Sequence, residues 1–224
     1  RTAHCSNPSC QAEIPLLKQF YISKRRNTNS KQWVYLNPII IGNVIDFEIR
    51  KGICNIEGWN NRGNITCPCC GNITDISKLK EQFKQKKNNE KLLVIIEESS
   101  SIRNYRIPTQ EDLEVITKIN KNNQLPKQSL EVGNVRNFNT PGWGISSFDG
   151  LFSNRQGNVL QILLENIQKE QKQLCFSEEY NKSISTYLSI LFDKIICRNT
   201  SFGVWHKLQE TVEHPFGRQA IPMV

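Results

Sequence analysis

The sequence predicts an α+β fold in which a β-rich first part precedes a mainly helical last part. Two patterns carry this prediction. Residues Val44–Arg50 alternate between apolar and polar side chains, as a strand with one buried face does. After Ser153 and again after Ser177, apolar residues recur every three to four positions, which is the period of an α-helix. We therefore expect a β-rich domain at 1–80, a connector with a short strand and helix at 81–139, and a helical portion at 140–224.

Composition describes a basic protein of 224 residues with a formal net charge of +8. Such a charge favours polyanionic partners, nucleic acid above all, although the solubility of a lysine-rich chain explains it as well. No apolar stretch approaches the roughly 20 residues of a membrane-spanning helix and no signal peptide opens the chain, so we expect a cytoplasmic protein. The chain lacks an initial Met and ends at Val224 without a polar tail, so we also expect a fragment of a longer polypeptide.

Two short-range cysteine pairs are the strongest chemical signal. Cys5 and Cys10 are separated by four residues, and Cys67 and Cys70 by two. Two tight turns that each present two sulfur atoms, separated by a long loop, build a tetrahedral thiolate site, whereas disulfides would suit a secreted protein. Four thiolates leave no open coordination position. The four cysteines are therefore predicted to bind one structural zinc ion rather than a catalytic metal.

The remaining cysteines and His4 are weaker candidates for metal ligands. Cys69 could replace a neighbour, but the two-residue spacing favours Cys67 with Cys70. His4 adjoins Cys5, and a surface histidine is the better explanation for it. The other three cysteines have apolar neighbours and are predicted to be small, buried hydrophobic residues: Cys54, Cys175 and Cys197.

A β-hairpin is predicted between the cysteine pairs. Residues 31–38 and 44–50 are rich in β-branched and aromatic side chains, and Gly42-Asn43 between them is a turn signal. The domain at 1–80 is therefore predicted to be a zinc ribbon with an inserted hairpin. A basic cluster before the hairpin is predicted to contact phosphate, although a solvated loop end explains it equally: Lys24, Arg25, Arg26 and Lys31.

The connector is predicted to be only partly structured. Residues 76–91 are polar and predict an exposed helix or a flexible connector, and residues 92–96 predict a buried strand. Thr109, with Asp112 three residues later, forms a capping box that starts a helix. Residues 118–139 are polar and broken by proline and glycine, which predicts a linker.

Two long helices are predicted in the last part of the chain. Ser153 with Gln156 forms a second capping box, and Ser177 is the N-cap of the following helix. We expect the two helices to pack antiparallel to each other or onto a larger domain. The second helix carries a broad apolar stripe: Tyr180, Ile184, Tyr187, Leu188, Leu191, Phe192 and Ile195.

No complete catalytic site is predicted, because the sequence lacks a dinucleotide-binding glycine motif, a phosphate-binding loop, a metalloprotease motif and paired carboxylates. Several segments nevertheless resemble, in the same order, one family: adenine-specific DNA methyltransferases with a zinc-ribbon region inside the catalytic chain. The order of the segments makes the resemblance specific. They are Cys5–Leu17, Gly63–Gly71, Tyr105–Thr109, Asp149–Gln156, Cys197–Ser201 and Phe216–Val224.

The resemblance implies that the full-length enzyme transfers a methyl group from S-adenosylmethionine to the exocyclic amine of an adenine flipped out of DNA. In that family, the cofactor-binding glycine motif precedes this region and the catalytic Asp-Pro-Pro-Tyr motif follows it. The resemblance therefore implies that this chain alone is inactive, that it contacts DNA and the remainder of the catalytic domain, and that it contributes no catalytic residue. Five residues in its family-like motifs are expected at the junction with the catalytic domain, although ordinary helix-end hydrogen bonding explains them almost as well: Arg155, Gln156, Arg198, Arg218 and Gln219.

The chain departs from the family pattern at Gln11, because the family has Gly after the second cysteine. We expect an altered turn with all four ligands retained. The alternative function is a free-standing zinc-ribbon module that binds nucleic acid, or joins a larger assembly, without catalytic activity.

Overall fold

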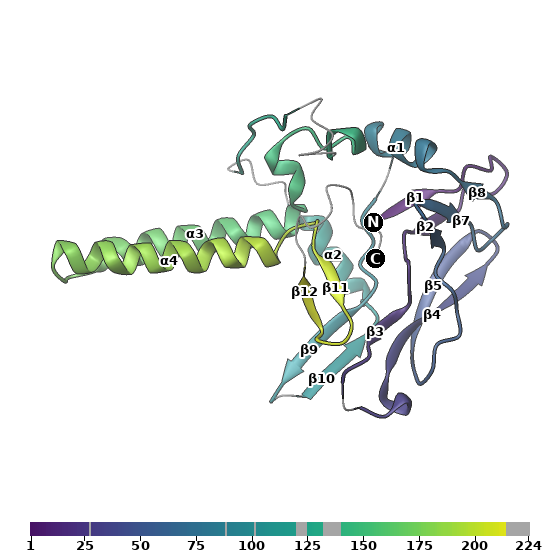
Figure 1. Cartoon of the computed structure of the whole chain (residues 1–224), viewed down its shortest axis with the longest axis horizontal. Coiled ribbons are helices and arrows are strands. Elements are labelled where there is room, and N and C mark those ends of the chain that lie inside the picture. Colours follow the sequence, from purple (N-terminus) through teal and green to yellow (C-terminus); the bar gives the residue numbers. More distant parts are fainter. Residues whose placement is uncertain (27, 88, 101, 120–124, 132–139, 214–224) are drawn as a thin grey trace.

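The computed structural model describes residues 1–26, 28–87, 89–100, 102–119, 125–131 and 140–213. These residues form four α-helices and five small antiparallel sheets, and a long helical hairpin projects from the body that the sheets build (Figure 1). The observed class is mixed α and β, as predicted. Among the described residues, no helix combines the length and the apolar character that crossing a membrane requires.

Two small hairpins carry the paired cysteines. Strands β1 (Thr2–His4) and β2 (Glu13–Pro15) pair antiparallel, and the turn between them holds the first two cysteines. Strands β6 (Asn60–Asn61), β7 (Asn64–Thr66) and β8 (Ile73–Thr74) form a three-stranded sheet, and the turn between β7 and β8 holds the second two. Each cysteine pair therefore lies in a turn between two short antiparallel strands.

The hairpin predicted between the two cysteine pairs in the sequence is part of a three-stranded sheet. Strands β3 (Tyr21–Ser23), β4 (Val34–Ile41) and β5 (Val44–Lys51) pair in that order, with a short 3-10 helix, Ser30–Gln32, before β4. The register runs from Val34 opposite Lys51 to Ile41 opposite Val44, so Gly42 and Asn43 form the two-residue turn. Gly42 has a φ of 61°, which L side chains rarely adopt, and this explains the turn signal.

One hydrophobic core joins this sheet to residues beyond the first eighty. Phe20 packs against Trp59, with ring centroids 5.1 Å apart, in a core that also contains Phe47. Helix α1 (Ile76–Lys84) buries Leu79 and Phe83, so this polar segment is a helix that covers the core rather than a flexible connector. The expected boundary at residue 80 falls inside α1.

The middle of the chain forms a further hairpin and a helix. Strands β9 (Ile95–Ser99) and β10 (Ile102–Arg106) pair antiparallel, and α2 (Gln110–Lys118) follows. The strand predicted at 92–96 therefore starts three residues later, and the predicted burial is wrong, because β9 belongs to a two-stranded sheet and its residues are half-buried or exposed. The capping box of Thr109 and Asp112 is confirmed.

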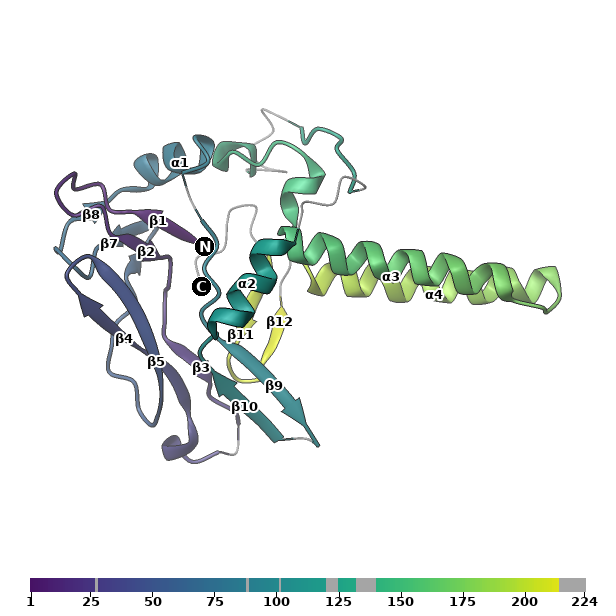
Figure 2. The same cartoon turned by 180° about the vertical axis from the view of Figure 1, so that it is seen from behind.

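Short elements connect these parts to the end of the described chain. Two 3-10 helices, Thr140–Trp143 and Phe148–Leu151, precede the long helices. Strands β11 (Val204–His206) and β12 (Thr211–Glu213) form a hairpin that lies near α2 and β10 in both views (Figure 2). Trp205 Nε1 donates to the Ile22 carbonyl at 2.7 Å, which fixes this hairpin to β3.

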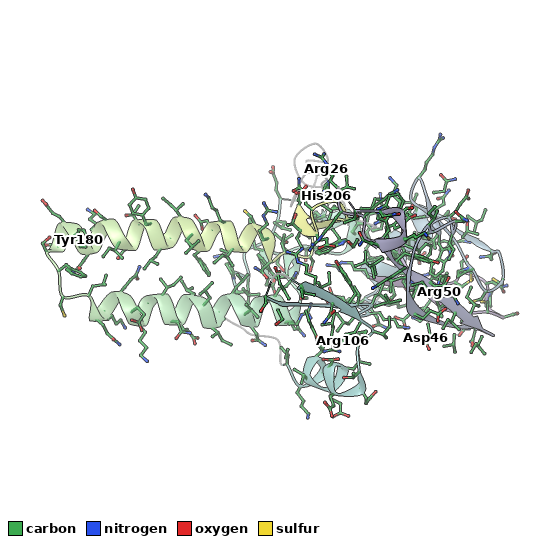
Figure 3. The ribbon with its side chains drawn as sticks, turned by 90° about the horizontal axis from the view of Figure 1, so that it is seen from below. Arg26, Asp46, Arg50, Arg106, Tyr180 and His206 are labelled. Atoms are coloured by element: carbon green, nitrogen blue, oxygen red, sulfur yellow. The ribbon has the colours of Figure 1, made fainter. Side chains whose placement is uncertain are left out.

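The projecting hairpin consists of α3 (Asn154–Gln173) and α4 (Glu178–Arg198). The predicted caps are confirmed, since Ser153 and Gln156 form a capping box and the Ser177 side chain accepts from Tyr180 N. The two helices pack on each other, and α3 buries residues only in its first two turns, while α4 buries none. Tyr180, in the first turn of α4, lies near the tip of the hairpin, far from the labelled residues of the body (Figure 3).

Candidate metal centre

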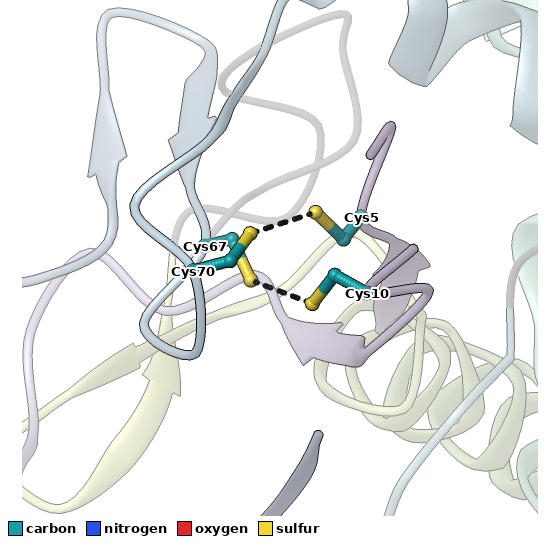
Figure 4. Close-up of side chains that lie close together, drawn as sticks. All are labelled: Cys5, Cys10, Cys67 and Cys70. Carbon is teal, nitrogen blue, oxygen red and sulfur yellow. Dashed lines mark hydrogen bonds between the residues drawn. The ribbon is translucent and has the colours of Figure 1, made fainter. Parts of the chain in front are cut away.

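The four cysteines predicted as ligands converge at one point. Their Sγ atoms all lie within 4.8 Å of one another (Figure 4). The Sγ atoms of Cys5 and Cys70 are 3.6 Å apart, and those of Cys10 and Cys67 are 3.8 Å apart, so each short distance joins one turn to the other. A tetrahedron with metal–sulfur bonds of about 2.3 Å has edges of about 3.8 Å. These two distances therefore match a tetrahedral metal site, and the other sulfur–sulfur distances stay within 4.8 Å.

Backbone hydrogen bonds shape the first turn so that both sulfur atoms point to the same side. Cys5 N donates to the Ala12 carbonyl at 2.9 Å, and Cys10 N donates to the Asn7 carbonyl at 3.0 Å. The Asn7 side chain accepts from Ser9 N at 3.0 Å, which is an Asx turn. These bonds hold the four residues between the ligands in one compact conformation.

The second turn repeats the arrangement with fewer residues. Cys67 N donates to the Asn72 carbonyl at 2.9 Å, and Gly71 N donates to the Cys67 carbonyl at 2.8 Å. Gly71 has a φ of 73°, and its counterpart in the first turn, Gln11, has a φ of 49°. The two turns thus share a left-handed residue directly after the second cysteine, and Gln11 adopts the conformation for which Gly would be better suited.

Each cysteine turn contains an asparagine whose side-chain amide lies near a sulfur atom of the other turn. Asn7 Nδ2 lies 3.8 Å from Cys70 Sγ, and Asn72 Nδ2 lies 3.9 Å from Cys5 Sγ, so each amide donates across to the opposite turn. Asn72 Nδ2 also donates to Ser6 Oγ at 2.8 Å. Donors of this kind orient metal ligands and stabilise thiolate charge. In the sequence, each asparagine lies two residues after a predicted ligand, and this position is the signal that could have revealed the role.

The surroundings shift the pKa values of two of the thiols in opposite directions. Burial raises the pKa of the Cys5 thiol to about 12. The backbone N–H of Asn72 lowers the pKa of Cys70 to about 7. Four thiolates at this spacing repel one another, and a divalent cation at their centre removes that repulsion. The donor set therefore fits a metal ion, and an all-thiolate tetrahedron is typical of zinc and of iron–sulfur sites.

The other candidate ligands lie outside the cluster. Cys69 is not among the four converging thiols, and burial raises its pKa to about 11. His4 Nδ1 lies 3.4 Å from the Gln11 carbonyl, so the ring contacts the turn rather than the cluster. Cys54 is half-buried, whereas Cys175 and Cys197 are exposed. The predicted burial of the last two is wrong, because they lie on the projecting hairpin or in its loop, where no other element covers them.

The left-handed residues give a direct test of the turn geometry. Replacing Gln11 with Gly should raise the free energy of unfolding by about 0.5–1 kcal/mol, since an L residue in this conformation costs about 1–2 kcal/mol and Gly recovers part of that. Gly71→Ala should lower it by a similar amount through backbone strain alone, because a Cβ there would meet nothing within 4 Å. Urea denaturation of the metal-loaded protein measures both; a destabilised Gln11→Gly variant would contradict the turn geometry.

The four residues predicted to contact phosphate have different surroundings. Lys24 Nζ lies 4.0 Å from the centroid of the Trp33 ring, a cation–π contact. Arg25 Nη2 forms a 2.6 Å ion pair with Glu210 Oε2. Arg26 and Lys31 are exposed. Two of the four cations thus contact other side chains of the protein, and two are exposed.

Three of the residues expected at the domain junction come together. Arg155, Gln156 and Arg198 line one cavity of ≈ 350 Å³ at the base of the helical hairpin. Gln156 Oε1 accepts from Ser153 N at 2.9 Å and from Ser201 Oγ at 3.1 Å, and Arg198 donates to the Val212 carbonyl. Arg218 and Gln219 lie outside the described residues, as does the segment 216–224.

No protein-family model, no curated protein and no solved structure matches the chain. The family resemblance therefore rests on the sequence motifs alone.

Proposed function

We propose that this chain is the zinc-binding, DNA-contacting region of an S-adenosylmethionine-dependent, adenine-specific DNA methyltransferase. The convergence of four thiols from two similar turns is the observation that carries the proposal, because both cysteine turns belong to the ordered segments of the resemblance. Zinc is the metal we assign, since it takes four thiolates in a closed tetrahedral site without redox chemistry. In this view, the two cysteine hairpins and the inserted β3–β4–β5 sheet form a zinc ribbon.

The metal has a structural role in this proposal. Strands β1, β2, β6, β7 and β8 contain only two or three residues each, so their ladder hydrogen bonds alone hold them weakly. A zinc ion shared by both turns would fix the two hairpins against each other. When bound by the remainder of the enzyme, S-adenosylmethionine would supply the methyl group, and this chain would hold DNA while the target adenine leaves the stack.

Surface features are consistent with both proposed partners. The net charge of +8 and the exposed Arg26 and Lys31 suit the phosphates of DNA in the cytoplasm. Three apolar side chains along α4, namely Tyr180, Tyr187 and Leu191, are 56%, 75% and 52% exposed. We assign this stripe, with the cavity at the base of the hairpin, to contact with the remainder of the catalytic domain.

The continuous coding frame around this segment provides the first test. We expect a glycine-rich cofactor motif before residue 1 and an Asp-Pro-Pro-Tyr motif after residue 224. Cells that express the complete frame should then accumulate N6-methyladenine in their DNA, measured by mass spectrometry of hydrolysed DNA. A frame that stops close to both ends, in a chain that still binds zinc and DNA, would instead establish the free-standing module.

Neutralising two exposed cations should weaken DNA binding in a salt-dependent way. For Arg26→Gln/Lys31→Gln, we expect the slope of log K against log salt concentration to lose about 0.9 per phosphate contact removed, or about 1.8 in total. Fluorescence anisotropy of a labelled duplex measures the slope. The matched control is Lys169→Gln/Lys172→Gln, which removes two exposed cations from distal α3. Equal slopes for both double variants would show that Arg26 and Lys31 make no specific contact.

A further inference from the structure

A cavity of ≈ 400 Å³ between the inserted sheet and β10 gathers four cations. Arg25, Lys31, Lys51 and Arg103 line it, together with polar side chains that include Tyr105. These residues come from three separate segments of the chain: the loop after β3, the end of β5, and β10. Like charges that converge in one cavity repel one another, so this arrangement needs either a buried counter-charge or an anionic ligand.

A buried glutamate supplies part of the counter-charge. Glu210 has a side chain with 0% exposure, and its Oε2 accepts from Arg25 Nε at 2.8 Å and from Arg103 Nη1 at 2.7 Å. The Tyr105 hydroxyl donates to Oε1 of the same carboxylate. Both guanidinium groups are therefore fixed in place by one carboxylate. Each guanidinium has five N–H donors, so both retain donors beyond these bonds while lining the cavity.

The charges around the cavity do not balance. Arg103 Nε also pairs with Glu98 Oε2 at 3.1 Å, so two carboxylates face four cations and two positive charges remain. Within the part of the chain that the structure describes, no ion pair joins Lys31 or Lys51 to a carboxylate. Two guanidiniums that Glu210 holds, together with two exposed ammonium groups, form an arrangement that suits a phosphate group.

We propose that this cavity binds a backbone phosphate of DNA, with Arg25 and Arg103 as fixed donors and Lys31 and Lys51 as closing charges. The proposal rests on the proposed function, because it identifies where the DNA-contacting region holds its ligand. A polynucleotide is favoured over a free phosphate compound because Arg26, which is exposed and adjoins Arg25 in the sequence, adds a further cation outside the cavity lining. Free phosphate compounds offer the same chemistry, and the experiment separates them.

Adjacent residues on β5 provide a matched pair of variants. Lys51 lines the cavity, whereas its neighbour Arg50 does not, since successive side chains of a strand point to opposite faces. Lys51→Gln and Arg50→Gln remove the same charge one residue apart, and both positions are exposed enough to leave the fold intact. We expect Lys51→Gln to weaken binding of a labelled duplex several-fold and to reduce the salt slope by about 0.9, with a smaller effect from Arg50→Gln.

Competition with inorganic pyrophosphate at constant ionic strength distinguishes the two sources of phosphate. If pyrophosphate displaces the duplex from the wild-type chain, and displaces it less from Lys51→Gln, the result supports a backbone phosphate in the cavity. If pyrophosphate binds in a Lys51-dependent way while duplex affinity is unchanged in Lys51→Gln, the cavity takes free phosphate compounds and the proposal is overturned. Equal losses of duplex affinity in Lys51→Gln and Arg50→Gln also overturn it, but the proposal that this region contacts DNA would still stand. Absence of duplex binding by the zinc-loaded wild type overturns both this proposal and DNA contact by the region.

Discussion

Replacing Cys67 with Ser is expected to abolish zinc binding and to unfold the cysteine hairpins together with the sheet between them. Cys67 is 1% exposed and its sulfur lies 3.8 Å from that of Cys10, so no other side chain replaces it without moving the turn. Structural zinc sites contribute about 10–16 kcal/mol of apparent binding free energy at neutral pH, which exceeds the stability of most domains of this size. Loss of one of four thiolates should therefore remove most of the stability of this part.

Two cysteine controls separate ligand loss from a general effect of removing a thiol. Cys69→Ser changes the neighbouring position within the same turn, and Cys175→Ser changes an exposed residue near the tip of the hairpin. Both variants should retain one zinc ion per chain by elemental analysis, together with the wild-type unfolding midpoint. Zinc retained in Cys67→Ser but lost in Cys69→Ser would mean that the ligand set is Cys5, Cys10, Cys69 and Cys70.

Glu210→Gln is expected to have the second-largest effect, lowering the free energy of unfolding by about 2–4 kcal/mol at neutral pH. The substitution leaves two arginines beside a neutral amide inside the protein, and uncompensated charges of this kind typically cost about 3–5 kcal/mol. We expect less than the maximum because the Arg25 side chain is 40% exposed and water screens it in part. Urea denaturation measures the difference. Glu98→Gln, which affects a half-exposed partner of the same Arg103, should cost below about 1 kcal/mol.

The effect of Glu210 should depend on pH in a defined direction. Burial opposes the charge of this carboxylate, but hydrogen bonds from Arg25, Ser23, Tyr105 and Arg103 outweigh it and lower the pKa to about 2. A depressed pKa means that the ionised group stabilises the fold above the unfolded-state value of about 4.3, and that this contribution is lost as the pH falls towards 2. Acid also releases zinc from thiolates, so the difference between wild type and Glu210→Gln is the quantity to follow. That difference should be constant from pH 7 to 5 and shrink below pH 4; a constant difference down to pH 3 would contradict the ionised pair.

Local signals in the sequence predicted the parts of the structure that depend on neighbouring residues. Cysteine spacing identified the same four thiols that converge, because each pair sits in one short turn. Capping boxes located the starts of α2 and α3, since they require residues only three positions apart. The turn at Gly42 and Asn43 was equally local, because a two-residue connection fixes the register of both its strands.

Features that depend on distant contacts were not predictable in the same way. Arg25 was predicted to contact phosphate or to lie at a solvated loop end, and neither prediction included its partner Glu210, which is 185 residues away in the sequence. Nothing in the local pattern around Glu210 indicates a buried carboxylate. Likewise, the apolar neighbours of Cys197 predict burial, and only the tertiary arrangement shows that Cys197 is exposed among the described residues. Burial is a property of the whole fold, which a single segment of sequence does not report.

The helical hairpin also has a consequence for how the chain should unfold. Because α4 buries no residue and α3 buries only its first turns against the body, the hairpin is expected to open as a separate cooperative unit. It contains most of the helical residues described, at 20 and 21 residues, whereas all four tryptophans lie outside it. Far-ultraviolet circular dichroism should accordingly report mainly the hairpin, and tryptophan fluorescence the zinc-dependent body. A chelator should quench or shift the fluorescence while much of the helical signal persists, and amide hydrogens of α4 should exchange by local opening of the hairpin.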